Sequence, residues 1–347
     1  MERGSFFPGA SGTPVSTFFY PVMSFNPDAQ EALQLLEGFF YWSGIPKLLG
    51  CELESDFSKA DIALAGLPLA VNPIERTQYL APRAVRHRSQ AYHRSHREFG
   101  INPFELARIR DFGDVPLNTP TIADRAVLDV EKFYARMDAA GAIPFTVGGD
   151  HACTLPVLRA IAGPNSRRKG PVGIIHFDSH TDSYGDSAGV HCHPGNGFRL
   201  GLEEGLIDPS RYVHIGLNGP MVHPQMDGFS RDAGYRMLTL SEIEEIGIPA
   251  AIAEIARVIG DGPVFVTVDL DVMTLSDAPA VADPEVGGLT MREMQQILRS
   301  FRGMDVIGGD VVCFVPHLDP SQVTALHVSA IMHEIVTVMA ENVARKR

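Results

Sequence analysis

The residues best suited to chemistry lie in one short stretch, H-F-D-S-H-T-D, which follows an apolar, β-prone run. It places Asp178, His180 and Asp182 at alternate positions. If a strand continued through the stretch, the three side chains would share one face. The pattern favours a strand that ends near Asp178, with the other two side chains on the following turn. Carboxylates that gather in a cleft repel one another and resist desolvation. The stretch therefore predicts a site for one or two divalent cations.

Two further apolar runs end in residue types that bind metals. T-V-G-G-D-H ends at His151, and T-V-D-L-D supplies Asp269 and Asp271. Each motif alone is commonly a turn with a capping aspartate or a solvated strand end. Together with the first stretch they offer two imidazoles and four carboxylates, enough for two ions that share bridging carboxylates. This donor set suits Mn²⁺ and also admits Ni²⁺, Co²⁺ or Fe²⁺, whereas thiol-rich zinc sites look different.

The elements that must position these groups alternate along the chain. Strands are expected at residues 61–67, 109–115, 143–147, 172–177, 212–215, 264–268 and 306–315. Helices are expected at residues 29–40, 80–92, 122–140, 154–162, 198–205, 241–245, 250–259, 290–301 and 322–344. This alternation is typical of an α/β fold with three αβα layers, in which helices flank a mostly parallel sheet. The ligand site of such a fold lies beyond the carboxyl ends of the strands.

Two of the expected helices carry a capping signal. Ser241 is followed three residues later by Glu244, and Thr290 is followed in the same way by Glu293. A hydroxyl with an acid three residues on is the pattern of a capping box. We therefore predict helix starts at Ser241 and Thr290.

Composition limits the classes of protein. The net charge of −13 argues against nucleic acid as a partner, because no basic face balances the acid. Four scattered cysteines without a C-x-x-C spacing argue against a disulfide framework and favour a reducing compartment, the cytoplasm. No apolar run of membrane-spanning length and no signal peptide are recognised, so no membrane partner is expected. We expect a loosely ordered arm at residues 1–28 and a single domain at residues 29–347.

The motifs resemble those of the ureohydrolase superfamily, which includes arginase and agmatinase. The family's G-G-D-H, D-A-H-x-D and D-x-D motifs occur here in the same order, with Ser179 in place of the usual Ala. The resemblance covers about residues 35–340 and implies an arginase-like fold assembled as a homo- or hetero-oligomer, a trimer or hexamer. It implies that one ion is bound by His151, Asp178, Asp182 and Asp269. It implies that the other is bound by Asp178, His180, Asp269 and Asp271.

The resemblance also implies a hydrolase with two divalent metal ions, Mn²⁺ or Ni²⁺. Hydroxide held by the ions would attack the carbon of a guanidinium group, and Asp182 or Asp271 would accept the remaining proton. The departing amine needs a proton, which a histidine near the rim usually donates. The corresponding segment here reads H-C-H-P-G-N-G-F-R, in which His193 is the first candidate and His191 the second. The other of the two would then be a surface histidine.

Two departures from the family's pattern concern the substrate. Asp283 stands where the family has Thr, and Cys313 stands where it has the Glu that holds the guanidinium. Loss of that Glu removes a charge-assisted contact, whereas an acid at position 283 offers a cation a partner from another direction. Asn196 and Asn218 are further candidates for substrate contact. We therefore expect a small cationic guanidine other than arginine or plain agmatine as the substrate.

The favoured substrate is a small or N-alkylated guanidine or a biguanide, which would be cleaved to urea or a substituted urea and an amine. The alternatives are an agmatinase or guanidino-acid hydrolase, or a subunit of a hetero-oligomeric ureohydrolase that is active only with its partner. A related amidohydrolase with a single Zn²⁺ would need fewer acidic ligands.

Overall fold

The computed structural model describes residues 44–72, 75–186 and 191–347. The expected arm at residues 1–28 and the expected helix at residues 29–40 lie outside these ranges. Ile45–Arg347 form one compact unit.

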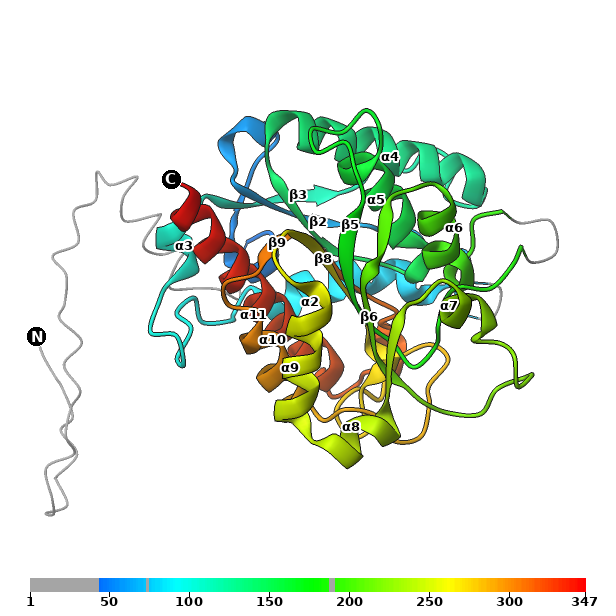
Figure 1. Ribbon diagram of the computed structural model, residues 1–347. Helices are drawn as coiled ribbons and strands as arrows, with labels where there is room; N and C mark the ends of the chain where they lie inside the picture. The colour runs from blue at the N-terminus through cyan, green and yellow to red at the C-terminus, as the bar shows by residue number, and fades with distance from the viewer. Residues whose placement is uncertain (1–43, 73–74, 187–190) are drawn as a thin grey trace, which may run out of the picture. The chain divides into compact units, whose positions relative to one another are not determined.

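A nine-stranded parallel sheet runs through the middle of this unit, in the order β1-β3-β2-β4-β9-β8-β5-β6-β7 (Figure 1). The strands are β1 (Glu52–Leu53), β2 (Ile62–Gly66), β3 (Ile109–Asp114), β4 (Ile143–Val147), β5 (Val172–Phe177), β6 (Ile207–Leu217), β7 (Arg236–Thr239), β8 (Pro263–Asp269) and β9 (Asp305–Val312). Because the strands are parallel, all their carboxyl ends meet at one edge.

The central strands are apolar on both faces because helices cover both. In β5, Ile175 and Phe177 join one buried cluster, whereas Val172 and Ile174 join the other. Residues at alternate positions of a strand point to opposite faces, so the continuous apolar run fills two cores. This packing confirms the predicted mostly parallel sheet.

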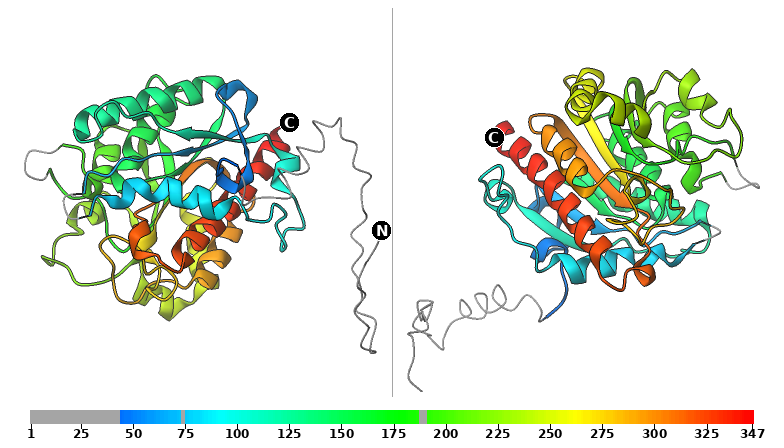
Figure 2. Two further views of the ribbon diagram at one scale, coloured as in Figure 1. Left: turned by 180° about the vertical axis from the view of Figure 1, so that it is seen from behind. Right: turned by 90° about the horizontal axis from the view of Figure 1, so that it is seen from below.

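The helices form a layer on each face of the sheet (Figures 1 and 2). The first core contains residues of α2 (Ala81–Ser89), α9 (Ile248–Ile259), α10 (Met291–Ser300) and α11 (Val323–Lys346). The second contains residues of α4 (Ala123–Ala140), α5 (Thr154–Ala162) and α6 (Gly197–Glu203). The shorter helices are α3 (Pro103–Leu106), α7 (Gly228–Asp232) and α8 (Leu240–Ile246). The predicted three αβα layers are confirmed.

One of the two predicted helix caps is confirmed and the other is wrong. At α10, Thr290 Oγ1 accepts from the N–H of Glu293, whose carboxylate accepts in return from the N–H of Thr290. At α8 the cap is Thr239, whose hydroxyl accepts from the N–H of Glu242 at 3.1 Å. The chain turns directly from β7 into the helix, so Ser241 already lies in the first turn.

Several strand limits differ from the prediction. β7 was not predicted, because its R-M-L-T sequence at the edge of the sheet lacks an apolar run. β9 ends at Val312 rather than at residue 315, because Cys313 has a left-handed φ of 69°. The N–H of Cys313 then donates to Gly149 O at 2.7 Å. This turn brings the end of β9 against the G-G-D-H loop.

The long closing helix α11 is a core helix. By length and composition it could span a membrane, so the prediction that no run reaches that length is wrong in this narrow sense. However, 83% of its most apolar window is buried inside the protein. Seen from below, it lies beside α10 over the sheet (Figure 2).

Candidate metal centre

The predicted metal ligands lie in loops at the carboxyl edge of the sheet. His151 begins a short 3₁₀-helix after β4, and Asp178 directly follows β5, which ends at Phe177 as the sequence indicated. Asp269 is the last residue of β8, and Asp271 lies in the 3₁₀-helix that follows. Parallel pairing from β4 through β9 and β8 to β5 brings these loops together.

A first cluster surrounds one nitrogen of His151. Nδ1 lies 3.0 Å from Asp178 Oδ2, 2.9 Å from Asp182 Oδ2 and 3.3 Å from Asp269 Oδ2. The imidazole is buried, and none of these approaches has the alignment of a hydrogen bond. One nitrogen offers at most one proton, so it cannot satisfy three carboxylates. A divalent cation among these atoms would satisfy all four groups.

The opposite nitrogen of His151 determines which ring nitrogen carries the proton. Thr267 Oγ1 lies 2.9 Å from His151 Nε2 and donates to Asp310 Oδ1 at 2.6 Å. Thr154 donates to the other oxygen of Asp310 at 2.8 Å. Because the only proton of the Thr267 hydroxyl goes to Asp310, the hydroxyl must accept from Nε2–H. In the neutral ring, Nδ1 then presents a lone pair to the carboxylates, as a metal ligand would.

A second cluster joins His180 to Asp271 and Asp178. His180 Nδ1 lies 3.0 Å from Asp271 Oδ2 and 3.5 Å from Asp178 Oδ1. Asp178 therefore directs Oδ2 to the first cluster and Oδ1 to the second, which is the geometry of a bridging carboxylate. Asp269 belongs to the first cluster, and its Oδ1 accepts from the N–H of Asp271 at 3.0 Å.

The site concentrates negative charge where water is excluded. Burial, followed by repulsion from Asp178, raises the pKa of Asp182 to about 7. Burial and the neighbouring Asp269 raise the pKa of Asp271 well above its usual range. Asp178 behaves differently: burial opposes its charge, but contacts with His151 and other imidazoles hold its pKa well below the usual range. Such a group of competing carboxyls is a strong binding site for a cation.

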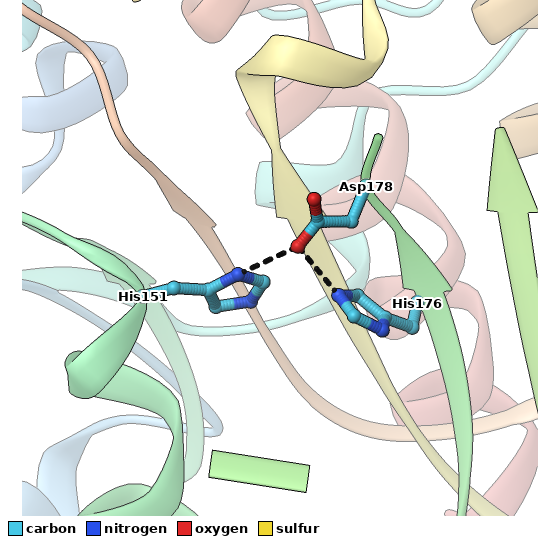
Figure 3. Close-up of side chains that lie close together, drawn as sticks. All are labelled: His151, His176 and Asp178. Carbon is cyan, nitrogen blue, oxygen red and sulfur yellow. Dashed lines mark hydrogen bonds and ion pairs between the residues drawn. The ribbon is translucent and has the colours of Figure 1, made fainter. Parts of the chain in front are cut away.

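His176 contacts a predicted metal ligand, and the sequence analysis did not single it out. Figure 3 shows one oxygen of Asp178 between the rings of His151 and His176. His176 Nε2 lies 2.9 Å from Asp178 Oδ2, and Nδ1 lies 2.7 Å from the hydroxyl of Tyr212. Since a carboxylate only accepts, Nε2 donates to it and Nδ1 accepts from Tyr212. The sequence feature that could have identified His176 is its position two residues before Asp178, on the same face of the strand.

The main chain of Asp178 is held as well. His214 Nε2 lies 2.9 Å from Asp178 O, and burial lowers the pKa of His214 to about 4. A neutral His214 that donates through Nε2 fixes the end of β5 from the neighbouring strand. Two buried imidazoles thus orient one shared ligand.

The predicted proton donors lie in the loop that enters α6. His193 Nδ1 accepts from the N–H of Gly195 at 3.2 Å, and Nε2 lies 3.0 Å from Gly185 O. His191 is exposed, and its Nδ1 lies 3.4 Å from Asp186 Oδ1. Among the described contacts, neither histidine touches a predicted metal ligand.

The loop is nevertheless tied to the site. Tyr184 N–H donates to Gly195 O at 2.9 Å, and Phe198 N–H donates to Asp182 O at 3.2 Å. Asn196 holds the loop from inside: its amide accepts from the N–H of His193 and donates to His191 O. The structure therefore gives Asn196 a role in shaping this loop.

The predicted substrate residues lie in three different settings. Cys313 is buried, and burial together with Asp269 raises the pKa of its thiol well above the usual range, so it stays neutral. Asp283 is exposed, has a φ of 50° and accepts from Asn72 Nδ2 at 3.1 Å. Asn218 donates to Val286 O at 2.7 Å and so fixes the loop that contains Asp283.

Comparison with known proteins gives the class. Residues 60–337 match the arginase family. Guanidinopropionase of Pseudomonas aeruginosa is 37% identical over 88% of this chain and 94% of its own length. Mitochondrial agmatinase of Gallus gallus is 31% identical over 85% of this chain and 86% of its own length. The structure of proclavaminate amidino hydrolase from Streptomyces clavuligerus superposes with a TM-score of 0.81 and 29% identity, covering 86% of this chain and 98% of that one.

The chain therefore belongs to the arginase family, and the predicted arginase-like fold and ureohydrolase resemblance are confirmed. It is an amidinohydrolase, which cleaves C–N bonds of guanidino compounds.

Proposed function

We propose that this amidinohydrolase binds two divalent ions, Mn²⁺ or Ni²⁺, at the paired clusters. His151, Asp178, Asp182 and Asp269 would hold one ion. Asp178, His180, Asp269 and Asp271 would hold the other. The observation that carries this proposal is that three carboxylate oxygens lie within 3.3 Å of His151 Nδ1. The oxygen-rich donor set favours these metals over those of thiolate sites.

When bound, the ions supply a water molecule of lowered proton affinity as the nucleophile. The guanidinium carbon gains a C–O bond and loses its C–N bond to the amine, giving urea or a substituted urea. Asp182 or Asp271 accepts the proton that the nucleophile releases. His193 delivers a proton to the nitrogen of the departing amine, with His191 as the second candidate.

The substrate that we favour is a small or N-alkylated guanidine or a biguanide. A neutral thiol at the buried Cys313 leaves the guanidinium without a carboxylate at that position. Asp283 offers a carboxylate at the exposed side, where a second cationic group would lie.

An agmatinase or guanidino-acid hydrolase is supported equally by the relatives. Guanidinopropionase and agmatinase are both similar to this chain over more than four fifths of its length. A further alternative is that the chain is one subunit of a hetero-oligomer, a trimer or hexamer, and is active only with its partner. Activity of the purified chain alone would exclude this alternative.

A substrate panel tests the proposal. Metal-free protein is loaded with Mn²⁺ or Ni²⁺ and given a biguanide, N-alkylguanidines, agmatine, 3-guanidinopropionate and arginine, and both the urea and the amine are measured. We expect the largest kcat/KM for an alkylguanidine or the biguanide. A clear preference for arginine would overturn the substrate proposal, and a preference for agmatine or the guanidino acid would select the alternative.

A further inference from the structure

A carboxylate that has no place in the proposed mechanism lies against the outer edge of His180. Glu285 Oε1 is 3.5 Å from His180 Nε2, whereas Nδ1 of the same ring faces Asp271 Oδ2 at 3.0 Å. The ring is thus placed between two carboxylates, one on each nitrogen. The Glu285 side chain is 18% exposed, so solvent screens this contact only in part.

The neighbouring backbone leaves space for this carboxylate. Gly219 has a φ of 82°, and a Cβ at this position would lie 2.2 Å from the carboxyl group of Glu285. A side chain here would push the end of the flexible Glu285 side chain aside, and the positive φ itself favours glycine. The glycine therefore leaves room for the carboxylate beside His180.

The segment that contains Glu285 is anchored at both ends to the segments that directly follow β9 and β8. At one end, Ala282 N–H donates to Cys313 O at 3.2 Å. At the other, Leu289 N–H donates to Val272 O at 2.8 Å, next to Asp271. Asn218 holds the middle through Val286 O. Glu285 is therefore positioned by the same strand ends that position the second cluster.

We propose that Glu285 is a positioning residue for His180, an inference that rests on the proposed two-ion site. As the acceptor for Nε2–H, Glu285 keeps the proton on that nitrogen and leaves the lone pair of Nδ1 directed at the ion. The two imidazoles of the site then have different outer partners, the Thr267 hydroxyl for His151 and the Glu285 carboxylate for His180. Only the ion bound by His180 depends on Glu285.

Titration of metal-free protein with Mn²⁺ by calorimetry, with metal analysis after desalting, tests this inference. For Glu285→Ala we expect one of the two ions to bind about 10- to 100-fold more weakly and the other to bind as in the wild type. Glu285→Gln keeps an acceptor and should lie between these limits. Val286→Ala, an exposed change in the same loop, should bind both ions as the wild type does.

The outcomes separate this inference from the function on which it rests. If wild-type protein binds two ions and Glu285→Ala binds both with unchanged affinity, the role of Glu285 is refuted and the metal proposal stands. If Glu285→Ala weakens both ions equally, selective positioning of His180 is refuted. If wild-type protein binds fewer than two ions, the metal proposal fails, and this inference fails with it.

Discussion

At the scale of single residues, the direction of hydrogen bonds explains how an imidazole becomes a ligand. Asp310 accepts from Thr267, Thr267 accepts from His151 Nε2, and Nδ1 is left facing the carboxylates. Burial raises the pKa of Asp310 to about 6, so it is charged at neutral pH and can only accept. The hydrogen bonds therefore run from the Nε2–H of His151, through the Thr267 hydroxyl, to the buried carboxylate of Asp310.

The first prediction concerns this chain of hydrogen bonds. Thr267→Val removes the acceptor behind His151 and should weaken binding of one ion by about 10- to 100-fold. Thr267→Ser keeps the hydroxyl and should bind close to wild type. Mn²⁺ content at a fixed free concentration measures both. Equal metal affinity in the Val and Ser variants would contradict the role of Thr267.

The second prediction concerns pH. The pKa of Asp182 is raised to about 7, so in metal-free protein its carboxyl is protonated below that pH and an ion must displace the proton. The contribution of this proton should therefore make the apparent metal affinity rise with pH, by up to about tenfold per pH unit below pH 7, and that contribution should level off above pH 7. Titrations between pH 5.5 and 8.5 measure this. In Asp182→Asn the contribution of this proton should vanish. An unchanged pH profile would contradict the assignment of the raised pKa to Asp182.

The third prediction concerns the missing carboxylate at position 313. Cys313→Glu restores a charge-assisted partner for the guanidinium, an interaction worth about 1.5–3 kcal/mol. We expect KM to fall by about tenfold or more for agmatine and for a simple alkylguanidine alike, because both carry the same substituted guanidinium. Cys313→Ser, which adds no charge, should leave both KM values near those of the wild type. KM values that Glu does not change would show that position 313 does not contact the guanidinium.

At the scale of elements, strand ends position the chemistry and helix caps determine where the chain turns. Asp178 can share its two oxygens because β5 stops at Phe177 and the main chain of Asp178 is held by His214. Cys313 approaches Asp269 because β9 stops at Val312 and turns toward the G-G-D-H loop. The apolar pattern of the sequence predicted the end of β5 but not that of β9.

The fourth prediction distinguishes the observed cap of α8 from the expected one. Thr239→Ala removes the acceptor for the N–H of Glu242 and should lower the free energy of unfolding by about 1 kcal/mol. Ser241→Ala lies in the first turn and should change it by less than about 0.5 kcal/mol. Denaturant unfolding measures both. The reverse order would restore Ser241 as the cap.

The sequence alone predicted the central strands and the grouping of the ligands. β4, β5 and α5 have the predicted limits, because each is a compact apolar run with clear ends. β7 escaped prediction, because an edge strand needs only one partner and little apolar surface. The roles of Thr267 and Glu285 depend on contacts between strands or loops far apart in the chain, which periodicity does not report.

At the scale of the whole molecule, the two buried cores hold the carboxyl edge of the sheet rigid, although the carboxylates at that edge repel one another. β5, β8 and β4 lie between apolar helices on both faces, so their ends cannot separate to relieve repulsion among the carboxylates. Bound cations would relieve that repulsion. We therefore predict that metal binding stabilises the folded protein.

The fifth prediction follows from this coupling. Removal of metal with a chelator should lower Tm by several degrees, because ligand at 100 times its Kd stabilises the native state by about 2.7 kcal/mol. Added Mn²⁺ should restore Tm in the wild type and only in part in His151→Asn. Thermal unfolding with and without chelator measures the effect. A Tm that neither the chelator nor Mn²⁺ changes would contradict the coupling of stability to metal binding.

The most direct test is crystallography of the Mn²⁺-loaded protein with anomalous scattering at the manganese edge. The account predicts two anomalous peaks per chain, with Asp178 contacting both ions, His151 on one and His180 on the other. A single peak, or peaks remote from these side chains, would contradict it.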